Sequence, residues 1–221
     1  GPQDAVVRNN RIIGSQFHRM NDRGNGIYLW NTPGSEIRDN VIRYGRDGIF
    51  VNGSRDNLFS DNHMSDLRFA IHYMYAHDSE VSNNISLNNH VGFAIMFSDR
   101  IVAENNYSSN DRERGLFFNA ANYSKIAGNR VVGAEKCVFI YNANFNQISE
   151  AVMLGNRKDS QGNPTATFKV ERGGETLEFV VQPARLEVNS QSGDKVRVAG
   201  LQPRTAVIVG TPAPGSPAPS S

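Results

Sequence analysis

The chain repeats a four-residue pattern (small, aliphatic, variable, apolar) about every 22 residues. Six copies lie at residues 26–29, 48–51, 70–73, 94–97, 115–118 and 137–140, and they begin 22, 22, 24, 21 and 22 residues apart. A second series with nearly the same period consists of asparagines, at Asn10, Asn40, Asn62, Asn84, Asn106 and Asn129. Two independent series with one period favour a repeat architecture in which equivalent residues of successive units stack.

Short β-rich runs separate clusters of Gly, Asn, Asp and Ser, and no segment has the apolar spacing of a long amphipathic helix. At about 3.3 Å per residue, one repeat is long enough for three short strands and three turns. We therefore predict an all-β fold, a right-handed parallel β-helix of about six rungs with three short strands per rung. Its rungs stack about 4.8 Å apart, and the asparagines are expected to form a buried amide ladder.

Alternation along a strand separates core from surface. The pattern predicts two inward columns, Ile27, Ile49, Ile71, Ile95, Leu116 and Val138, and Leu29, Val51, Tyr73, Phe97, Phe118 and Ile140. It predicts two outward columns, Tyr28, Phe50, His72, Met96, Phe117 and Phe139, and Trp30, Asn52, Met74, Ser98, Asn119 and Tyr141. So much outward aromatic surface indicates a face that a partner or ligand covers. We expect that face to include Tyr28, Trp30, Phe50, Phe117, Phe139 and Tyr141, with Arg46 and Arg68 at its edge.

The repeat is expected to occupy residues 1–149, because Ala151 stands where the next asparagine is due and the register should end there. Residues 150–210 are predicted to form a small β-rich module or an arm that caps the last rung. Short antiparallel strands are expected at 165–170, 176–181, 195–198 and 206–209, with a hairpin turn at 172–175. Residues 211–221 are rich in Pro, Ser and Ala and are predicted to be a disordered tail.

Histidine and methionine cluster in one part of the chain, since all five histidines and four of the five methionines lie between residues 18 and 96. The sharpest group is His72, Met74 and Met96, with Met96 expected directly beside His72 on the next rung. Imidazole and thioether ligands suit Cu(I). The alternative is that these residues only pack in an aromatic surface ladder. His18 and Met20, in an insertion of about eight residues, are weaker candidate ligands, and Cys137 is most simply a substitute for glycine.

Basic residues precede the repeated pattern, at Arg23, Arg46, Arg68, Arg112, Arg114 and Lys136. Stacked cations repel one another unless carboxylates intervene, and candidates for that role are Asp22, Asp47, Asp66, Asp111 and Glu113. A ladder of compensated charges is therefore the first interpretation, and a site for an anion or an acidic partner is the second.

Several classes of protein are disfavoured. The net charge of +1 points to no particular partner, and we expect none that is a nucleic acid. No apolar run is long enough to span a membrane, and no signal peptide opens the chain. The rival function for this fold is binding or modification of polysaccharides by a lyase-, hydrolase- or epimerase-like β-helix. Because no adjacent pair of aspartates lies on a strand to supply acid and base, we favour a protein that is not an enzyme.

Residues 8–148 resemble the NosD family of copper-maturation proteins. The resemblance is carried by residues 24–31, 44–49, 67–75 and 134–142, and the run from Leu67 to Tyr75, with His-Tyr-Met at its centre, is the most specific. It implies a periplasmic accessory protein that handles copper during maturation of nitrous oxide reductase. It also implies partners: the ATPase and membrane subunits of an ABC transporter, a copper-chaperone lipoprotein and the reductase itself.

Overall fold

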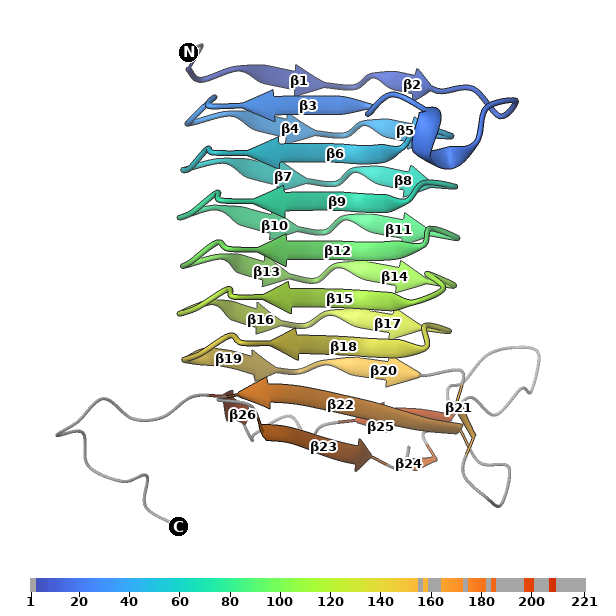
Figure 1. The fold of residues 1–221 in the computed structure, drawn as a ribbon, viewed down its shortest axis with the longest axis vertical. Helices are drawn as coiled ribbons and strands as arrows, with labels where there is room; N and C mark the ends of the chain where they lie inside the picture. The colour runs from blue at the N-terminus through green and yellow to red at the C-terminus, as the bar shows by residue number, and fades with distance from the viewer. Residues whose placement is uncertain are drawn as a thin grey trace, which may run out of the picture.

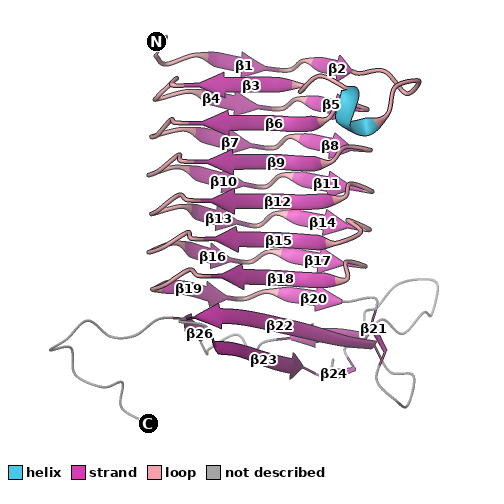
Figure 2. Cartoon of the chain, viewed as in Figure 1, coloured by secondary structure: helices cyan, strands magenta, loops and turns pink. Residues whose placement is uncertain are grey.

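The structure is a computed structural model. It describes residues 3–154 and, beyond them, the strand backbones at 157–158, 164–172, 175–181, 184–185, 197–200 and 207–209. The predicted tail at 211–221 lies outside the described residues. Nearly all regular structure is β, and a single 3-10 turn, η1 (Met20–Asp22), is present in the described part (Figure 2).

The strands form three sheets. Sheet 1 contains, in spatial order, β1 (Val6–Arg8), β4 (Glu36–Arg38), β7 (Leu58–Ser60), β10 (Glu80–Ser82), β13 (Val102–Glu104), β16 (Lys125–Ala127), β19 (Asn146–Ser149) and β26 (Val207–Val209). Sheet 2 contains β2 (Arg11–Ile13), β5 (Val41–Arg43), β8 (His63–Ser65), β11 (Ile85–Leu87), β14 (Tyr107–Ser109), β17 (Arg130–Val132), β20 (Val152–Leu154), β25 (Arg197–Gly200) and β24 (Ala184–Arg185). Sheet 3 contains β3 (Ile27–Trp30), β6 (Asp47–Asn52), β9 (Phe69–Met74), β12 (Val91–Met96), β15 (Arg114–Asn119), β18 (Lys136–Tyr141), β22 (Pro164–Arg172) and β21 (Arg157–Lys158), while β23 (Glu175–Val181) pairs with β22.

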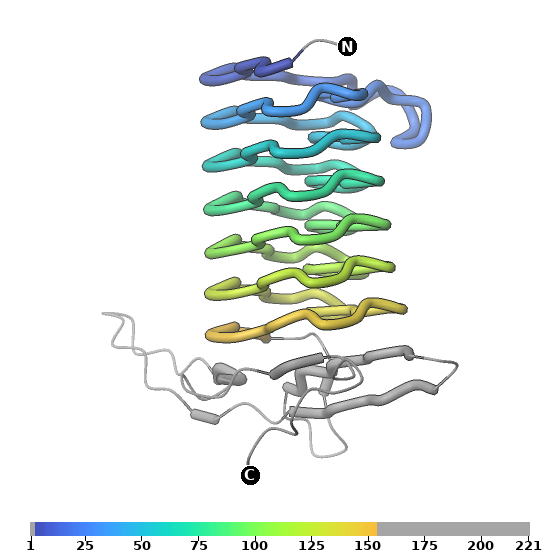
Figure 3. The backbone as a smooth tube through the Cα atoms, turned by 90° about the vertical axis from the view of Figure 1, so that its left-hand side faces the viewer, coloured from blue at the N-terminus to red at the C-terminus, as the bar shows by residue number. Residues whose placement is uncertain are grey.

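Each strand pairs in parallel with its equivalent one repeat later, as between β6 and β9. Consecutive strands thus belong to different sheets, and the chain winds as a coil whose rungs stack from the N-terminus downward (Figures 1 and 3). Six strands of sheet 3, from β3 to β18, mark six rungs. The predicted parallel β-helix is confirmed.

The core runs the length of the coil between the three sheets. Sheet 3 supplies two inward columns, Ile27, Ile49, Ile71, Phe93, Leu116 and Val138, and Leu29, Val51, Tyr73, Ile95, Phe118 and Ile140, all of them buried. Sheet 1 adds residues such as Ile37 and Phe59, and sheet 2 adds Ile42 and Met64. A continuous apolar column of this kind lets each rung bury its neighbour's face, which is what holds a solenoid together.

The predicted register of the fourth rung was wrong by two residues. Phe93 pairs with Ile71, and Ala94 pairs with His72, so the repeated pattern there begins at Gly92. Ile95 is still inward but occupies the second column, while Phe97 is 39% exposed and lies at the corner that follows the strand. The error arose because the pattern required an aliphatic second residue, and aromatic Phe93 did not fit it. Gly92 restores spacings of 22, 22, 22, 23 and 22.

The predicted asparagine ladder is confirmed. From Asn10 to Asn106, each side chain donates from Nδ2 to Oδ1 of the next asparagine toward the C-terminus, at 3.0 Å between Asn62 and Asn84 and 3.1 Å between Asn84 and Asn106. The same Oδ1 atoms accept the backbone N–H groups of the preceding rung, as Asn84 accepts from Asn62. Four members, Asn40, Asn62, Asn84 and Asn129, are at most 1% exposed. Each amide therefore satisfies a buried turn as well as its neighbour.

The sheets continue past the point where the sequence suggested a loss of register. β20 pairs in parallel with β17, with Val152 opposite Arg130, although Ala151 has replaced the asparagine. Beyond it, β22 pairs in parallel with β18, while β26 and β25 pair antiparallel with β19 and β20. Strands were predicted at these places, and the hairpin of β22 and β23 is antiparallel as expected. The three strand edges of the last rung are thus paired. The division of the chain at residue 149 stays a prediction.

Candidate functional site

The outer face of sheet 3 carries three columns of side chains, and we call it the aromatic face. Its first column is Tyr28, Phe50, His72, Ala94, Phe117 and Phe139. Its second column is Trp30, Asn52, Met74, Met96, Asn119 and Tyr141. Its third column is Asp47, Phe69, Val91, Arg114 and Lys136. The face lies toward the viewer in Figure 1, where the six long arrows from β3 to β18 form it.

Aromatic rings on this face form two separate stacks. In the first, Tyr28 and Phe50 lie 5.0 Å apart between ring centroids, and Phe50 and His72 lie 4.9 Å apart. In the second, Phe117 and Phe139 are 5.3 Å apart, and the Arg114 guanidinium lies over both rings. The spacing of parallel strands brings equivalent rings to stacking distance. Two of the predicted aromatic residues are largely exposed to solvent, Tyr28 at 56% and Trp30 at 70%.

Ala94 separates the two stacks and is fully buried although it points outward. It belongs to a small apolar cluster with Val91 and Phe117, against which Met96 and Phe139 pack. This cluster is distinct from the interior core. The middle of the aromatic face is therefore a packed apolar patch, and the more exposed aromatics lie toward its two ends.

His72 is held in one orientation by three neighbours. Its Nδ1 atom lies 3.0 Å from Oδ2 of Asp47, and its ring packs against those of Phe50 and Phe69, at 4.9 and 4.5 Å between centroids. Arg68 donates two hydrogen bonds to the same carboxylate, at 2.8 and 2.7 Å. The sequence had suggested Asp47 only as a counter-charge to arginine. Its role as a partner of His72 depends on a contact between adjacent rungs.

The protonation of this group follows from the charge of Asp47. Burial raises the pKa of the Asp47 carboxyl, but hydrogen bonds from His72 and Arg68 outweigh burial and leave that pKa below its usual value. An ionised carboxylate only accepts hydrogen bonds, so Nδ1 of His72 is the donor. In the neutral imidazole, the lone pair is then on Nε2, which is the nitrogen that can bind a metal ion.

The two methionines lie side by side. Met74 and Met96 are directly opposite each other on β9 and β12, in the second column, and both are half-buried. The expected contact of Met96 with His72 in register is wrong, because Ala94 occupies that place. His72 precedes Met74 by two residues on the same outward side, and Met96 is its diagonal neighbour. Diagonal neighbours on a sheet are about 7–8 Å apart, within reach of long side chains.

The weaker candidates lie elsewhere. His18 is exposed in the loop that contains η1 and hydrogen-bonds Ser15, and Met20 opens that turn. The loop projects from the N-terminal rungs (Figure 3), and no contact joins it to His72 within the described part of the chain. Cys137 is 1% exposed and belongs to the interior core, as a substitute for glycine would. Burial raises the pKa of its thiol to about 12.

The predicted ladder of compensated charges is present in part. Arg68 pairs with Asp47, Arg43 with Asp66 at 3.2 Å, and Arg114 with Glu113. Arg46 makes no ion pair with any described residue, and its Nε atom is buried without a hydrogen-bond partner. Asp111 does not compensate a cation: it is fully buried and accepts hydrogen bonds from Ser86 and Ser108 at 2.6 Å.

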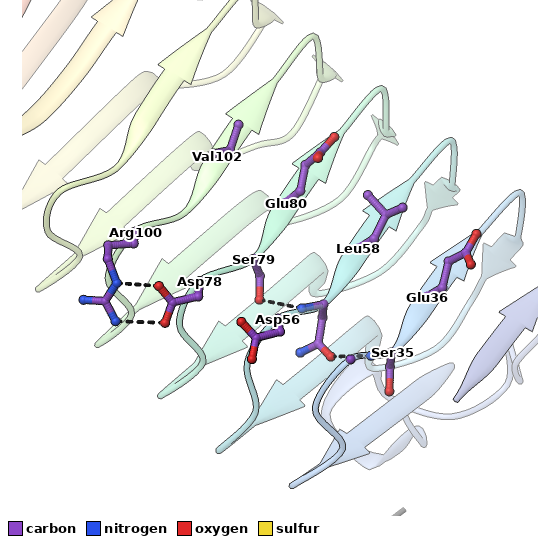
Figure 4. Close-up of a pocket in the computed structure, with 11 residues that line it drawn as sticks. Ser35, Glu36, Asp56, Leu58, Asp78, Ser79, Glu80, Arg100 and Val102 are labelled. Atoms are coloured by element: carbon purple, nitrogen blue, oxygen red, sulfur yellow. Dashed lines mark hydrogen bonds and ion pairs between the residues drawn. The ribbon is translucent and has the colours of Figure 1, made fainter. Parts of the chain in front are cut away.

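Two shallow grooves lie along the corner that connects sheet 3 to sheet 1. The first, of about 610 Å³, runs along sheet 1 and is lined by Glu36, Asp56, Asp78, Glu80 and Arg100, with Arg100 paired to Asp78 (Figure 4). The second, of about 470 Å³, includes Tyr75. The sequence did not indicate either groove, because both combine residues from several turns between strands.

Metal-binding groups of the most common kind are not found. Among the described residues, no three His, Cys, Asp or Glu side chains are close enough together to hold a metal ion. Methionine thioethers are not part of that set. Nor does any helix in the described ranges have the length and apolar character for crossing a membrane.

Comparisons with known proteins identify relatives of the repeat region. A family model described as "Periplasmic copper-binding protein (NosD)" matches residues 8–162. The chain is 34% identical over 163 residues to a probable ABC transporter binding protein NosD of Stutzerimonas stutzeri, and 35% identical over 158 residues to the protein of that name in Pseudomonas aeruginosa. These matches cover 67% and 65% of this chain but only 37% of each relative.

A solved structure, an exopolygalacturonase from Thermotoga maritima, aligns with a TM-score of 0.39 at 11% identity, over 81% of this chain and 55% of that one. The family model spans more than half of the chain and reaches beyond Ile148, where the sequence resemblance had seemed to end. From the family model, and from the parallel β-helix that the matched residues form, the chain belongs to the NosD family of periplasmic copper-binding proteins.

Proposed function

We propose that this chain is a copper-handling part of a periplasmic accessory protein that serves maturation of nitrous oxide reductase. In this proposal, copper is cargo, and His72, Met74 and Met96 hold it as Cu(I) on the aromatic face. The observation that carries the proposal is the fixed imidazole of His72 beside two thioethers that are in register with each other.

The donor set fits Cu(I). Thioethers and imidazole are ligands that this soft ion accepts, and neither a thioether nor a neutral imidazole must lose a proton to bind it. His72 offers Nε2, because Asp47 binds Nδ1. A carboxylate behind a ligating histidine is the usual arrangement in metal sites, since it orients the ring and increases its basicity. A site with few charged ligands can also pass the ion on to a partner.

The surroundings limit the access of water to the proposed ion. Phe50 and Phe69 both pack against the His72 ring, and Met96 packs against the apolar cluster at the centre of the face. The side chain of His72 is only 12% exposed. Apolar walls around a site limit access of solvent and favour the less charged state of the metal.

The metal site can be tested by anaerobic titration with Cu(I) in competition with a chromophoric chelator. We expect one tight site, at least tenfold weaker in His72→Ala, Met74→Ala and Met96→Ala. Asn119→Ala is the matched control, because Asn119 lies in the same column one rung beyond Met96. Unchanged affinity in both the His72 and Met96 variants overturns the assignment. His18 and Met20 stand outside the proposed site, so their alanine variants should titrate as the wild type does.

We also propose that the exposed ends of the aromatic face dock the proteins that exchange copper with it. The relatives are named as binding proteins of an ABC transporter, and the candidate partners are that transporter, a copper-chaperone lipoprotein and nitrous oxide reductase. Trp30 and Tyr141, 70% and 43% exposed, are at opposite ends of the second column with the methionines between them. Large exposed aromatics of this kind dominate the binding energy of many interfaces.

Docking can be separated from metal binding by calorimetric titration of the purified lipoprotein chaperone into this protein. Trp30→Ala and Tyr141→Ala should weaken association at least tenfold and leave Cu(I) affinity unchanged. Tyr123→Ala, which removes a comparably exposed aromatic from outside the aromatic face, is the control. Equal binding by all three variants would show that the aromatic face is not the docking surface.

A further inference from the structure

A second aromatic feature lies at the corner that follows sheet 3, outside the aromatic face. The corner column is Asn31, Gly53, Tyr75 and Phe97, one residue from each of four successive rungs. All four have positive φ, between 50° and 63°. Asparagine and glycine adopt this conformation readily, whereas a bulky aromatic residue does so at a cost. Tyr75 and Phe97 therefore occupy positions that do not favour them.

Tyr75 has one covered face and one open face. Its ring stacks on Phe97 with 5.0 Å between centroids and 12° between planes, yet 51% of the residue is exposed. On the other side, the next position in the column is Gly53, where even an added Cβ would meet no atom within 4 Å. Rungs are about 4.8 Å apart, so the missing side chain leaves a gap of about 9.6 Å between the Tyr75 and Asn31 positions. One flat ring fits this gap.

The gap belongs to the groove of about 470 Å³, which is lined by Gln3, Asn31, Pro33, Gly53, Ser54, Arg55, Tyr75 and His77. The polar groups at its rim are rich in donors. Arg55 is 71% exposed along its side chain and pairs only loosely with Asp56, at 3.6 Å. His77 is beside Arg55 on the next rung, joined by an isolated parallel bridge. Its Nδ1 accepts the backbone N–H of Asp99 at 3.0 Å, which leaves Nε2–H as a donor.

We propose that this groove binds a six-membered sugar ring that carries a carboxylate, as in a uronic acid unit of an acidic glycan. The apolar C–H face of the sugar stacks on the open face of Tyr75. Its carboxylate pairs with Arg55 and accepts from His77, and its hydroxyls bond Asn31. An arginine or lysine side chain from a protein would also stack on tyrosine, but the Arg55 charge at the rim repels it. The site is separate from the copper site and does not depend on it.

The Gly53 gap allows a sharp test. Gly53→Asn puts a side chain over the open face of Tyr75 in a conformation that asparagine tolerates, as Asn31 does one rung earlier at φ 50°. We expect trigalacturonic acid to bind the wild type in calorimetric and saturation-transfer NMR titrations. Binding should weaken at least tenfold in Gly53→Asn and in Tyr75→Ala. Tyr123→Ala is the control, since Tyr123 stacks on Phe145 in the same way two rungs farther along the coil.

Each outcome of these titrations supports or contradicts the sugar site. Loss of binding in the two groove variants with retention in Tyr123→Ala supports the site. If neutral maltotriose binds as tightly as trigalacturonic acid, the groove does not recognise the carboxylate. If an arginine-rich peptide binds more tightly than trigalacturonic acid, the sugar assignment is wrong. Absence of trigalacturonate binding to the wild type overturns the proposal. Cu(I) titration of Gly53→Asn should match the wild type, so failure of this site and failure of the copper site give different results.

Discussion

Nδ1 of His72 lies 3.0 Å from Oδ2 of Asp47, although the two residues are 25 positions apart in the sequence. The carboxylate is nearly inaccessible to water, since only 2% of the Asp47 side chain is exposed. Arg68, which directly precedes the strand of His72, supplies the opposite charge. This relationship makes the imidazole a fixed group, and it gives the copper proposal its most direct structural test.

Asp47→Asn should lower the affinity for Cu(I) about 10–100-fold, the usual effect of removing a carboxylate behind a metal ligand. The amide keeps the shape of the side chain but loses the charge that requires Nδ1 to donate. Competition titration measures the change, and circular dichroism checks the fold. Asp66→Asn is the control, because that carboxylate pairs with Arg43 and touches no proposed ligand. Affinity within twofold of the wild type in folded Asp47→Asn would refute a positioning role.

Arg68→Ala should destabilise the fold by about 3 kcal/mol, because it leaves a buried carboxylate without its charged partner. Arg43→Ala should cost at most about 1 kcal/mol, since the pair of Arg43 and Asp66 is 41% and 33% exposed along the side chains. Urea unfolding measures both free energies. Equal losses for the two variants would mean that burial of the Asp47 carboxylate does not determine the cost.

Asn84→Ala should destabilise the coil by more than about 3 kcal/mol, because it leaves several buried groups unsatisfied at about 1–3 kcal/mol each. The Asn84 amide bonds the carbonyls of Phe59 and Ser82 as well as Asn106. Asn10→Ala, at the exposed end of the ladder, should cost under about 1 kcal/mol. A thermal melt of each variant provides the comparison, and a larger loss at Asn10 would contradict the role of burial.

Asp111→Asn should stabilise the protein at neutral pH. Burial raises the pKa of the Asp111 carboxyl, and hydrogen bonds from Ser108, Ser86 and Asn89 offset this only in part. Because the folded pKa lies above the unfolded one, the carboxyl costs no stability below about pH 3.8. The cost grows as the pH rises from that value through the folded pKa, and it is constant above. The gain from Asp111→Asn should therefore be larger at pH 7 than at pH 4 in urea unfolding, and the opposite order would contradict the sign.

Cys137 should react with a thiol reagent only when the protein unfolds. Its side chain faces the core, and burial raises the thiol pKa to about 12. Cys137→Ala should leave Cu(I) affinity unchanged, because Ala70 occupies the equivalent buried position three rungs earlier. Rapid modification of the native thiol, or a loss of Cu(I) affinity in Cys137→Ala, would show that the thiol is accessible.

The sequence was sufficient to predict the coil, because stacking rungs require the same residue type at the same place. The asparagine series and the alternation of Ile27, Tyr28 and Leu29 are direct expressions of that requirement. The fourth rung was misplaced because Phe93 is an aromatic residue in an aliphatic column. A correct count from Gly92, at one period after Ala70, would have placed Met96 beside Met74.

The details of the site could not be predicted in the same way. The hydrogen bond between His72 and Asp47 depends on where these two side chains point on adjacent rungs. Periodicity does not specify where a side chain points. The burial of Ala94 depends on the larger neighbours around it. The sequence shows a glycine at position 53, 22 residues after Asn31 and 22 before Tyr75. That it leaves a gap could be seen only from the register of the corner.

The asparagine ladder has a direction as well as a position. From Asn10 to Asn106, each amide donates to Oδ1 of the next asparagine toward the C-terminus, so the side-chain carbonyls from Asn40 to Asn129 all point to the N-terminal side. From Asn40 to Asn129, each Nδ2 also donates to a backbone carbonyl of the preceding rung. The dipoles of the side chains therefore add along the axis of the coil, as peptide dipoles do along a helix. Extension of the ladder therefore requires units that wind in the same orientation, although antiparallel strands such as β25 and β26 can still pair with the last rung.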